Sequence, residues 1–198
     1  MARQTSARVA SVSRTLRRTP LARWLWMAVI GSAALAVALV ALAHAVAPSP
    51  DGARALIGRP APSFTLAAAQ HERMLSQPTT FDAHSGHPTL LVFFNTLCVH
   101  CVPGVQAAAA AARAPGLPTT DIIYLDAPGE NAEITGQYMT RLQQQPPVLL
   151  DAGARVANRY GVAYYPTLLL VDAQGVVREV WVGAPSATQL RDAIVRDH

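Results

Sequence analysis

The chain contains two cysteines, Cys98 and Cys101, separated by Val99 and His100. This C-x-x-C spacing lets the second sulfur reach the first, so a mixed disulfide formed at one thiol is resolved by the other. The two cysteines are too close in sequence for a disulfide between them to stabilise a fold by closing a long loop. The spacing therefore favours redox chemistry, with Cys98 as the predicted nucleophile and Cys101 as the predicted resolving thiol.

The residues around the pair predict how it is positioned. Thr89 to Phe94 (TLLVFF) is a continuous apolar run, typical of a strand that is buried on both faces. Val105 to Ala114 is dense in alanine and predicts a helix. The N-terminus of a helix favours a thiolate over a thiol, and can lower the pKa of a nearby cysteine from about 8.5 to between about 3.5 and 7.5. We therefore expect the first cysteine of the motif to be the more reactive one.

His100 lies inside the motif and has two interpretations. An imidazole close to the sulfur would stabilise the Cys98 thiolate and make the disulfide a stronger oxidant. The alternative is an exposed polar residue of the first helical turn that has no partner. We favour the first interpretation, because the position of His100 between the two cysteines forces it close to sulfur.

The rest of the globular part alternates strands and helices. A short strand is expected at 79–81, while the remainder of 67–80 has no clear periodicity. Further strands are expected at 121–125, 148–150, 164–171 and 176–182, and helices at 130–145, 154–160 and 186–196, with Ser186 as N-cap. Such alternation predicts an α/β fold whose central sheet has parallel crossovers and ends in an antiparallel hairpin.

Three stretches of this chain resemble the thioredoxin superfamily: GRPAPSFTL at 58–66, LLVFFNTLCVHC at 90–101 and YGVAYYPTLLLVDAQGVV at 160–177. Within that superfamily the chain resembles the TlpA/ResA-like group of membrane-anchored extracytoplasmic thioredoxins. The resemblance implies a thioredoxin-like fold, a central mixed sheet flanked by helices. It also implies that Pro166 follows a cis peptide bond beside the disulfide, and that Tyr165 and Pro166 bind the substrate. The C-x-H-C pattern is similar to that of the oxidising DsbA-like proteins.

The chain departs from this family at several positions. Leu97 stands where a tryptophan commonly precedes the first cysteine, and Val92 stands where thioredoxins place a buried acid. Without that acid, no general base for Cys101 is evident in the sequence. Pro103 closely follows Cys101, so we expect the helix either to start at Cys98 and kink at Pro103, or to begin effectively at Pro103.

The N-terminal part predicts a membrane anchor. No residue between Arg23 and Asp51 carries a full charge, and Trp24 to Ala47 is almost wholly apolar, which meets the roughly 20 residues that a spanning helix needs. A cleaved signal peptide is the alternative, with Ala43-His44-Ala45 as the cleavage site. The positive-inside rule places the arginine-rich end in the cytoplasm. The expected organisation is a cytoplasmic tail at 1–23, an anchor at 24–47, a linker at 48–56 and a thioredoxin-like domain at 57–198.

Charge excludes one class of partner. Six of the sixteen basic residues lie in the first 23 positions, which leaves ten arginines against twelve acidic residues in the remainder. This slightly acidic domain does not have the basic surface that binds nucleic acid.

We therefore expect a single-pass protein of the bacterial inner membrane. Its periplasmic domain would exchange disulfides with extracytoplasmic protein thiols or disulfides, assisted by a membrane redox partner and without a cofactor or metal. A soft-metal module that binds Cu(I) through the two thiolates is the alternative function, and an adaptor with incidental cysteines is a third. The sequence leaves the direction of electron flow and the substrate open.

Overall fold

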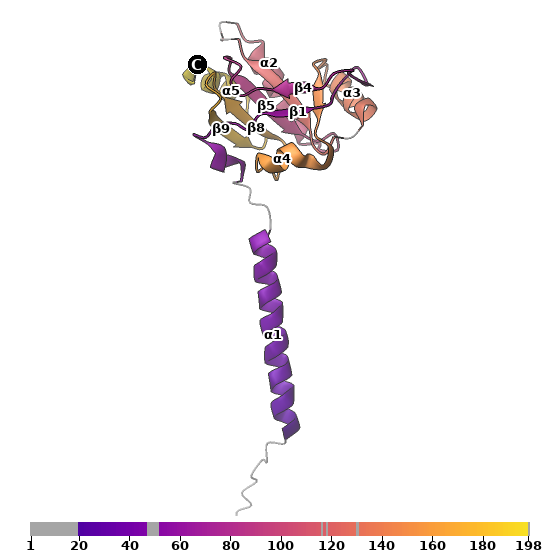
Figure 1. Cartoon of the computed structure of the whole chain (residues 1–198), viewed down its shortest axis with the longest axis vertical. Helices are drawn as coiled ribbons and strands as arrows, with labels where there is room; N and C mark the ends of the chain where they lie inside the picture. Colours follow the sequence, from indigo (N-terminus) through magenta and orange to yellow (C-terminus); the bar gives the residue numbers. More distant parts are fainter. Residues whose placement is uncertain (1–19, 47–51, 116, 118, 130, 198) are drawn as a thin grey trace, which may run out of the picture. The chain divides into compact units, whose positions relative to one another are not determined.

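The computed structural model describes residues 20–46, 52–115, 117, 119–129 and 131–197 (Figure 1). The chain divides into two units, Met1–Ala47 and Pro48–His198. The first unit contains helix α1 (Pro20–Val46), in which apolar side chains such as Ile30 and Leu35 are exposed. Among the described residues, no helix has both the length and the apolar character needed to cross a membrane. The predicted tail lies mostly outside the described residues.

The second unit is built on a seven-stranded sheet with the strand order β3-β2-β7-β6-β5-β8-β9, and a two-stranded sheet pairs β1 with β4. Helices lie against the sheet, as Figure 1 shows. The strands are β1 (Phe64–Leu66), β2 (Ala68–Gln70), β3 (Arg73–Met74), β4 (Thr79–Phe81), β5 (Thr89–Phe94), β6 (Asp121–Asp126), β7 (Val148–Leu150), β8 (Thr167–Val171) and β9 (Val177–Val182). The helices are α2 (Cys101–Ala112), α3 (Ala132–Arg141), α4 (Arg155–Arg159) and α5 (Ala187–Arg196), with short 3-10 turns η1 (Ala53–Leu56) and η2 (Ala152–Ala154).

The sheet is mixed, which confirms the predicted thioredoxin-like α/β fold. Strand β5 is parallel to β6, and β6 is parallel to β7, whereas β8 runs antiparallel to both β5 and β9. The register pairs Phe94 with Asp126 and Phe93 with Thr167. One end of the central sheet therefore brings together the last residues of β5 and β6 and the first residues of β8.

The core lies on both faces of the central strand β5, whose six residues are all buried. On one face Phe93 packs against Tyr160, with ring centroids 5.4 Å apart. On the other face Phe94 stacks on Tyr138 of α3, with centroids 5.3 Å apart, in a cluster that also contains Cys101. Each large apolar side chain buried in this way contributes about 1.5–3 kcal/mol to folding, so β5 is a rigid support for the loop that follows it.

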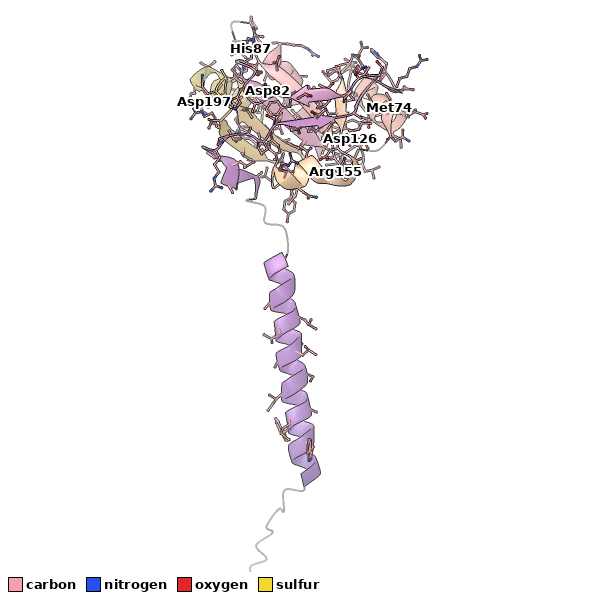
Figure 2. The ribbon with its side chains drawn as sticks, in the orientation of Figure 1. Met74, Asp82, His87, Asp126, Arg155 and Asp197 are labelled. Atoms are coloured by element: carbon pink, nitrogen blue, oxygen red, sulfur yellow. The ribbon has the colours of Figure 1, made fainter. Side chains whose placement is uncertain are left out.

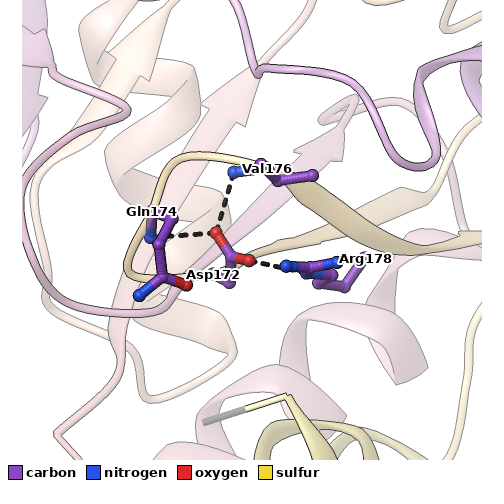
Figure 3. A network of polar contacts seen from close by, with 4 residues as sticks. All are labelled: Asp172, Gln174, Val176 and Arg178. Carbon is purple, nitrogen blue, oxygen red and sulfur yellow. Dashed lines mark hydrogen bonds and ion pairs between the residues drawn. The ribbon is translucent and has the colours of Figure 1, made fainter.

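The hairpin between β8 and β9 is fixed by one buried carboxylate (Figure 3). Asp172 Oδ1 accepts hydrogen bonds from the backbone N–H groups of Gln174 (2.9 Å) and Val176 (2.8 Å). Its Oδ2 accepts one from Arg178 Nε at 2.6 Å. The turn then closes at Gly175, whose φ of +82° belongs to the left-handed region that glycine adopts without strain.

Several boundaries differ from the sequence prediction. The expected linker contains the turn η1, in which Ala53 is buried in the core. The expected helix at 130–145 is shorter, because the Asn131 side chain caps α3 by accepting hydrogen bonds from the N–H groups of Glu133 and Ile134. At the other end, the helix cannot extend through Gln143, because the φ of this residue is 57° and a right-handed helix needs a negative φ. Strands β2 and β3 were not predicted, whereas the N-cap Ser186 of α5 is confirmed.

Candidate active site

The two cysteines differ in accessibility. Cys98 lies half-buried in the loop between β5 and α2, whereas Cys101 is the first residue of α2 and is fully buried; both are free thiols. The loop is held by two backbone hydrogen bonds, from Cys98 N–H to Asn95 O and from Cys101 N–H to Cys98 O, both 3.0 Å long. Leu97 and Val99 project from it with 87% and 77% of their surface exposed. An incoming sulfur therefore meets Cys98 first.

Helix α2 begins at Cys101, with His100 at the N-cap position. Both expected starting points, at Cys98 with a kink and at Pro103, are therefore wrong. Pro103 is the third residue of the helix, and the first four N–H groups of a helix have no intrahelical partner. The N–H that proline lacks is thus one that the helix would not have used, so Pro103 is compatible with the first turn.

The His100 side chain is exposed, and no hydrogen-bond partner for its imidazole lies within the described part of the chain. Its predicted role in stabilising the Cys98 thiolate stays a prediction.

The environment of Cys101 opposes its ionisation. Burial raises the pKa of Cys101 to about 12, and the neighbouring Cys98 thiol and the negative charge of Asp126 act in the same direction. The backbone N–H of Asn95 lowers this pKa, but by less than burial raises it. Cys101 is therefore a neutral thiol at physiological pH.

The loop before β8 completes the site. The Tyr165–Pro166 peptide bond is cis, as the sequence resemblance implied. Cys98 Sγ donates a hydrogen bond to the Tyr165 carbonyl at 3.5 Å. Helix α2 reaches the same loop through Gly104, where a Cβ atom would lie 3.1 Å from Pro166 Cγ. The structure thus brings Cys98, Cys101, Tyr165 and Pro166 together, while their roles toward a substrate stay predictions.

The sequence did not indicate a further residue of this region, Asp126. It is the last residue of β6 and only 2% exposed. Thr135 Oγ1 donates a hydrogen bond to its Oδ2 at 2.5 Å, whereas Oδ1 is buried without a hydrogen-bond partner in the described structure. Burial raises the pKa of Asp126, and the Thr135 hydroxyl and the Thr96 N–H lower it. An acidic residue at the end of an apolar strand was the available signal.

Within the described ranges, no three His, Cys, Asp or Glu side chains gather in a way that could hold a metal ion.

Comparison with known proteins identifies the family of the chain. A family model described as the AhpC/TSA family matches residues 57–180. A protein from Streptomyces lividans, "Mercury resistance operon ORF3", is 30% identical over 137 residues, which are 67% of this chain and 72% of that protein.

Solved structures share the fold at low sequence identity. A secreted disulfide oxidoreductase of Mycobacterium tuberculosis that is homologous to E. coli DsbE matches with a TM-score of 0.54 and 18% identity, over 67% of this chain and 95% of that one. StoA from Bacillus subtilis matches with a TM-score of 0.52 and 17% identity, over 67% and 96% of the two chains. A 2-Cys peroxiredoxin of Plasmodium vivax matches with a TM-score of 0.55 and 15% identity, over 71% and 95%.

The family match covers the strand before the cysteines, the cysteines themselves and the loop that contains Pro166. A C-x-x-C pair that follows the central strand of a thioredoxin-like fold carries out thiol–disulfide exchange. The chain therefore belongs to the AhpC/TSA family and is a thioredoxin-like oxidoreductase.

Proposed function

We propose that the domain exchanges disulfides with proteins outside the cytoplasm, with Cys98 as the attacking thiol and Cys101 as the resolving thiol. The observation that carries this proposal is the asymmetry of the pair: Cys98 is accessible, and Cys101 is fully buried directly behind it. A substrate sulfur can reach only the first thiol, so the second is reserved for the intramolecular step.

The exchange proceeds in two substitutions. The Cys98 thiolate attacks one sulfur of a substrate disulfide, which forms a mixed disulfide and releases the other substrate sulfur as a thiolate. Cys101 then attacks the Cys98 sulfur, which forms the Cys98–Cys101 disulfide and releases the second substrate thiolate. Two electrons pass from the pair to the substrate. The reverse sequence oxidises a substrate dithiol.

The loop before β8 is suited to hold the substrate during this exchange. The Tyr165 carbonyl accepts a hydrogen bond from Cys98 Sγ, so it lies where a partner backbone would pass on its way to the sulfur. An extended substrate segment would pair with this backbone while its cysteine meets Cys98. Leu97 and Val99, which flank Cys98 in the sequence and are exposed, would provide apolar contacts.

We further propose that the protein belongs to the TlpA/ResA-like group and is anchored in the bacterial inner membrane, with the domain in the periplasm. The support is the uncharged segment between Arg23 and Asp51 and the arginine-rich sequence before it. Disulfides form in that compartment, and a membrane redox partner would restore the pair after each turnover. Alkaline phosphatase fused after His198 would be active in this topology, and an inactive fusion would contradict it.

Replacing Cys101 tests the exchange directly. In Cys101→Ser, the mixed disulfide between Cys98 and the substrate cannot be resolved, so a covalent adduct accumulates that reducing agent releases. Cys98→Ser is the matched control and should give no adduct. If Cys101→Ser gives no adduct in cells or with a model protein disulfide, or if both variants give the same adduct, the proposed exchange is wrong.

A further inference from the structure

A pocket opens beside the cysteine loop. Its volume is about 280 Å³, and its walls include Thr96 and Leu97 from the loop, Asp126 from the end of β6 and Thr135 from α3. Leu97 is the residue directly before Cys98, so the pocket adjoins the redox site. Asp126, labelled in Figure 2, provides the carboxyl group of this pocket.

Asp126 is incompletely satisfied for a buried carboxylate. One oxygen is held by the Thr135 hydroxyl at 2.5 Å, and the other has no hydrogen-bond partner within the described residues. The Thr96 N–H also lowers the pKa of this carboxyl, but it leaves Oδ1 without a hydrogen bond. Buried polar groups are nearly always paired, because an unpaired one loses its hydration without compensation. An unpaired carboxylate oxygen at a pocket is therefore available to take up a proton.

Asp126 also interacts with the buried thiol. Asp126 pairs in register with Phe94, which packs in the same buried cluster as Cys101. The negative charge of Asp126 is also one of the causes that raise the pKa of Cys101. The other titratable groups that interact with Asp126 are Tyr138 from α3 and Tyr165 from the loop before β8. The hydroxyl of Tyr138 is likewise buried without a hydrogen-bond partner among the described residues.

We propose that Asp126 accepts the proton of Cys101 when Cys101 resolves the mixed disulfide, and returns this proton when the reaction runs in reverse. This inference rests on the proposed exchange function. It assigns to the end of β6 the task of the buried acid that the chain lacks at Val92 of β5.

The proton balance follows from the two-step exchange. The S–H bond of Cys101 breaks and its proton passes to the Asp126 carboxylate, either directly or through water. The sulfur then attacks Cys98, and the substrate leaves as a thiolate. The substrate disulfide is the oxidant. Asp126 afterwards loses the proton to solvent through the pocket that it lines, which restores the carboxylate for the next turnover.

Ellman's disulfide reagent separates the two steps in the full-length reduced protein. Attack by Cys98 releases one nitrothiobenzoate, and resolution by Cys101 releases a second one from the mixed disulfide. The first release tests the proposed function, and the second tests the role of Asp126. We would follow both releases across pH in wild type, in Asp126→Asn and in Asp121→Asn. Asp121 is an exposed carboxylate at the opposite end of the same strand and serves as the matched control.

In wild type the rate of the second release should rise with pH as the Asp126 carboxyl loses its proton, and then level off. In Asp126→Asn this rate should fall at least about 100-fold at neutral pH, the usual contribution of a positioned base. As the pH is raised, the rate of the second release in Asp126→Asn should rise in proportion to the hydroxide concentration. The rate of the first release should be the same as in wild type. Removing the Asp126 charge lowers the pKa of Cys101 and makes this thiol a stronger acid. A slower second release in Asp126→Asn therefore cannot be explained by a Cys101 thiol that ionises less readily.

Two results in Asp126→Asn would overturn the inference: a second release that is as fast as in wild type, or one that is slower by the same factor at every pH. No first release from wild type would overturn the proposed function and this inference with it. Thr135→Val tests the idea with the carboxyl in place. Loss of the hydroxyl raises the pKa of Asp126, so the midpoint of the second release should move to higher pH, and an unmoved midpoint contradicts the role.

Discussion

Asp126 and Asp172 are two aspartates of equal burial, each 2% exposed, with opposite surroundings. Asp172 accepts hydrogen bonds on both oxygens, from two backbone N–H groups and from the Arg178 side chain (Figure 3). Asp126 accepts one from Thr135 and keeps a second oxygen without a partner in the described structure. A saturated carboxylate stabilises the fold, whereas an unsaturated one retains its capacity to bind a proton.

The difference arises from where the partners come from. The donors to Asp172 are supplied within six residues by the hairpin that follows it, so its hydrogen bonds form together with the turn. The donor to Asp126 comes from α3, and the rest of its surroundings comes from the cysteine loop and the pocket. Burial alone therefore does not distinguish the two aspartates, but the number of hydrogen bonds that each carboxylate accepts does.

The largest effect on stability is expected at Asp172. Asp172→Ala should lower the free energy of unfolding by about 2–4 kcal/mol, because two buried N–H groups lose their acceptor and Arg178 loses its partner. Urea unfolding measures this loss, with Asp121→Ala as the exposed control, expected within about 0.5 kcal/mol of wild type. A loss no larger than that of the control, or a slower resolution step, would remove the distinction between the two aspartates.

Asp126→Asn should change how stability depends on pH. Because the folded-state pKa of Asp126 is raised, the unfolded chain loses this proton first as pH rises. Wild type should therefore lose stability between the ordinary carboxyl range and the raised pKa, and the variant should lack that loss. The stability of the variant relative to wild type should thus increase with pH in thermal unfolding. If the difference in stability between the variant and wild type is the same at every pH, the pKa of Asp126 is not raised in the folded protein.

The smallest effect is expected at Arg178, which pairs with Asp172 but has 44% of its side chain exposed. Arg178→Ala should cost about 1 kcal/mol or less, since exposed ion pairs contribute little and the two backbone donors still hold the carboxylate. Urea unfolding at low and high salt measures this cost. A loss as large as that of Asp172→Ala would mean that the ion pair, rather than the turn, fixes Asp172.

The fold was predictable where local chemistry determines it. Strand β5 was predicted with its observed ends, because a strand buried on both faces reads as a continuous apolar run. The start of α5 followed from Ser186, which forms a capping box with Gln189. Strands β2 and β3 were missed because residues 67–78 show no clear hydrophobic periodicity. They are held by pairing: β3 pairs with β2, and β2 pairs with β7, which lies some 80 positions later in the chain.

The site was predictable to the same extent. Cys98, Cys101 and Pro166 belong to motifs that carry their own sequence signal. Asp126 belongs to no motif, and its place at the end of an apolar strand does not by itself reveal its proximity to Cys101, which depends on the parallel register that pairs Asp126 with Phe94. The start of α2 was also mispredicted, since a proline in the first turn is compatible with a helix that starts two residues before it.

The antiparallel pairing of β5 with β8 has a consequence for the order of synthesis. Cys98 and its hydrogen-bond partner Tyr165 are 67 residues apart in the chain. Because the ribosome makes the N-terminal part first, both cysteines are translated well before the segment that completes their surroundings. Until β8 takes its place, the pair lacks this part of its surroundings, so we expect an oxidant or a foreign disulfide to react with the newborn chain more readily than with the finished protein.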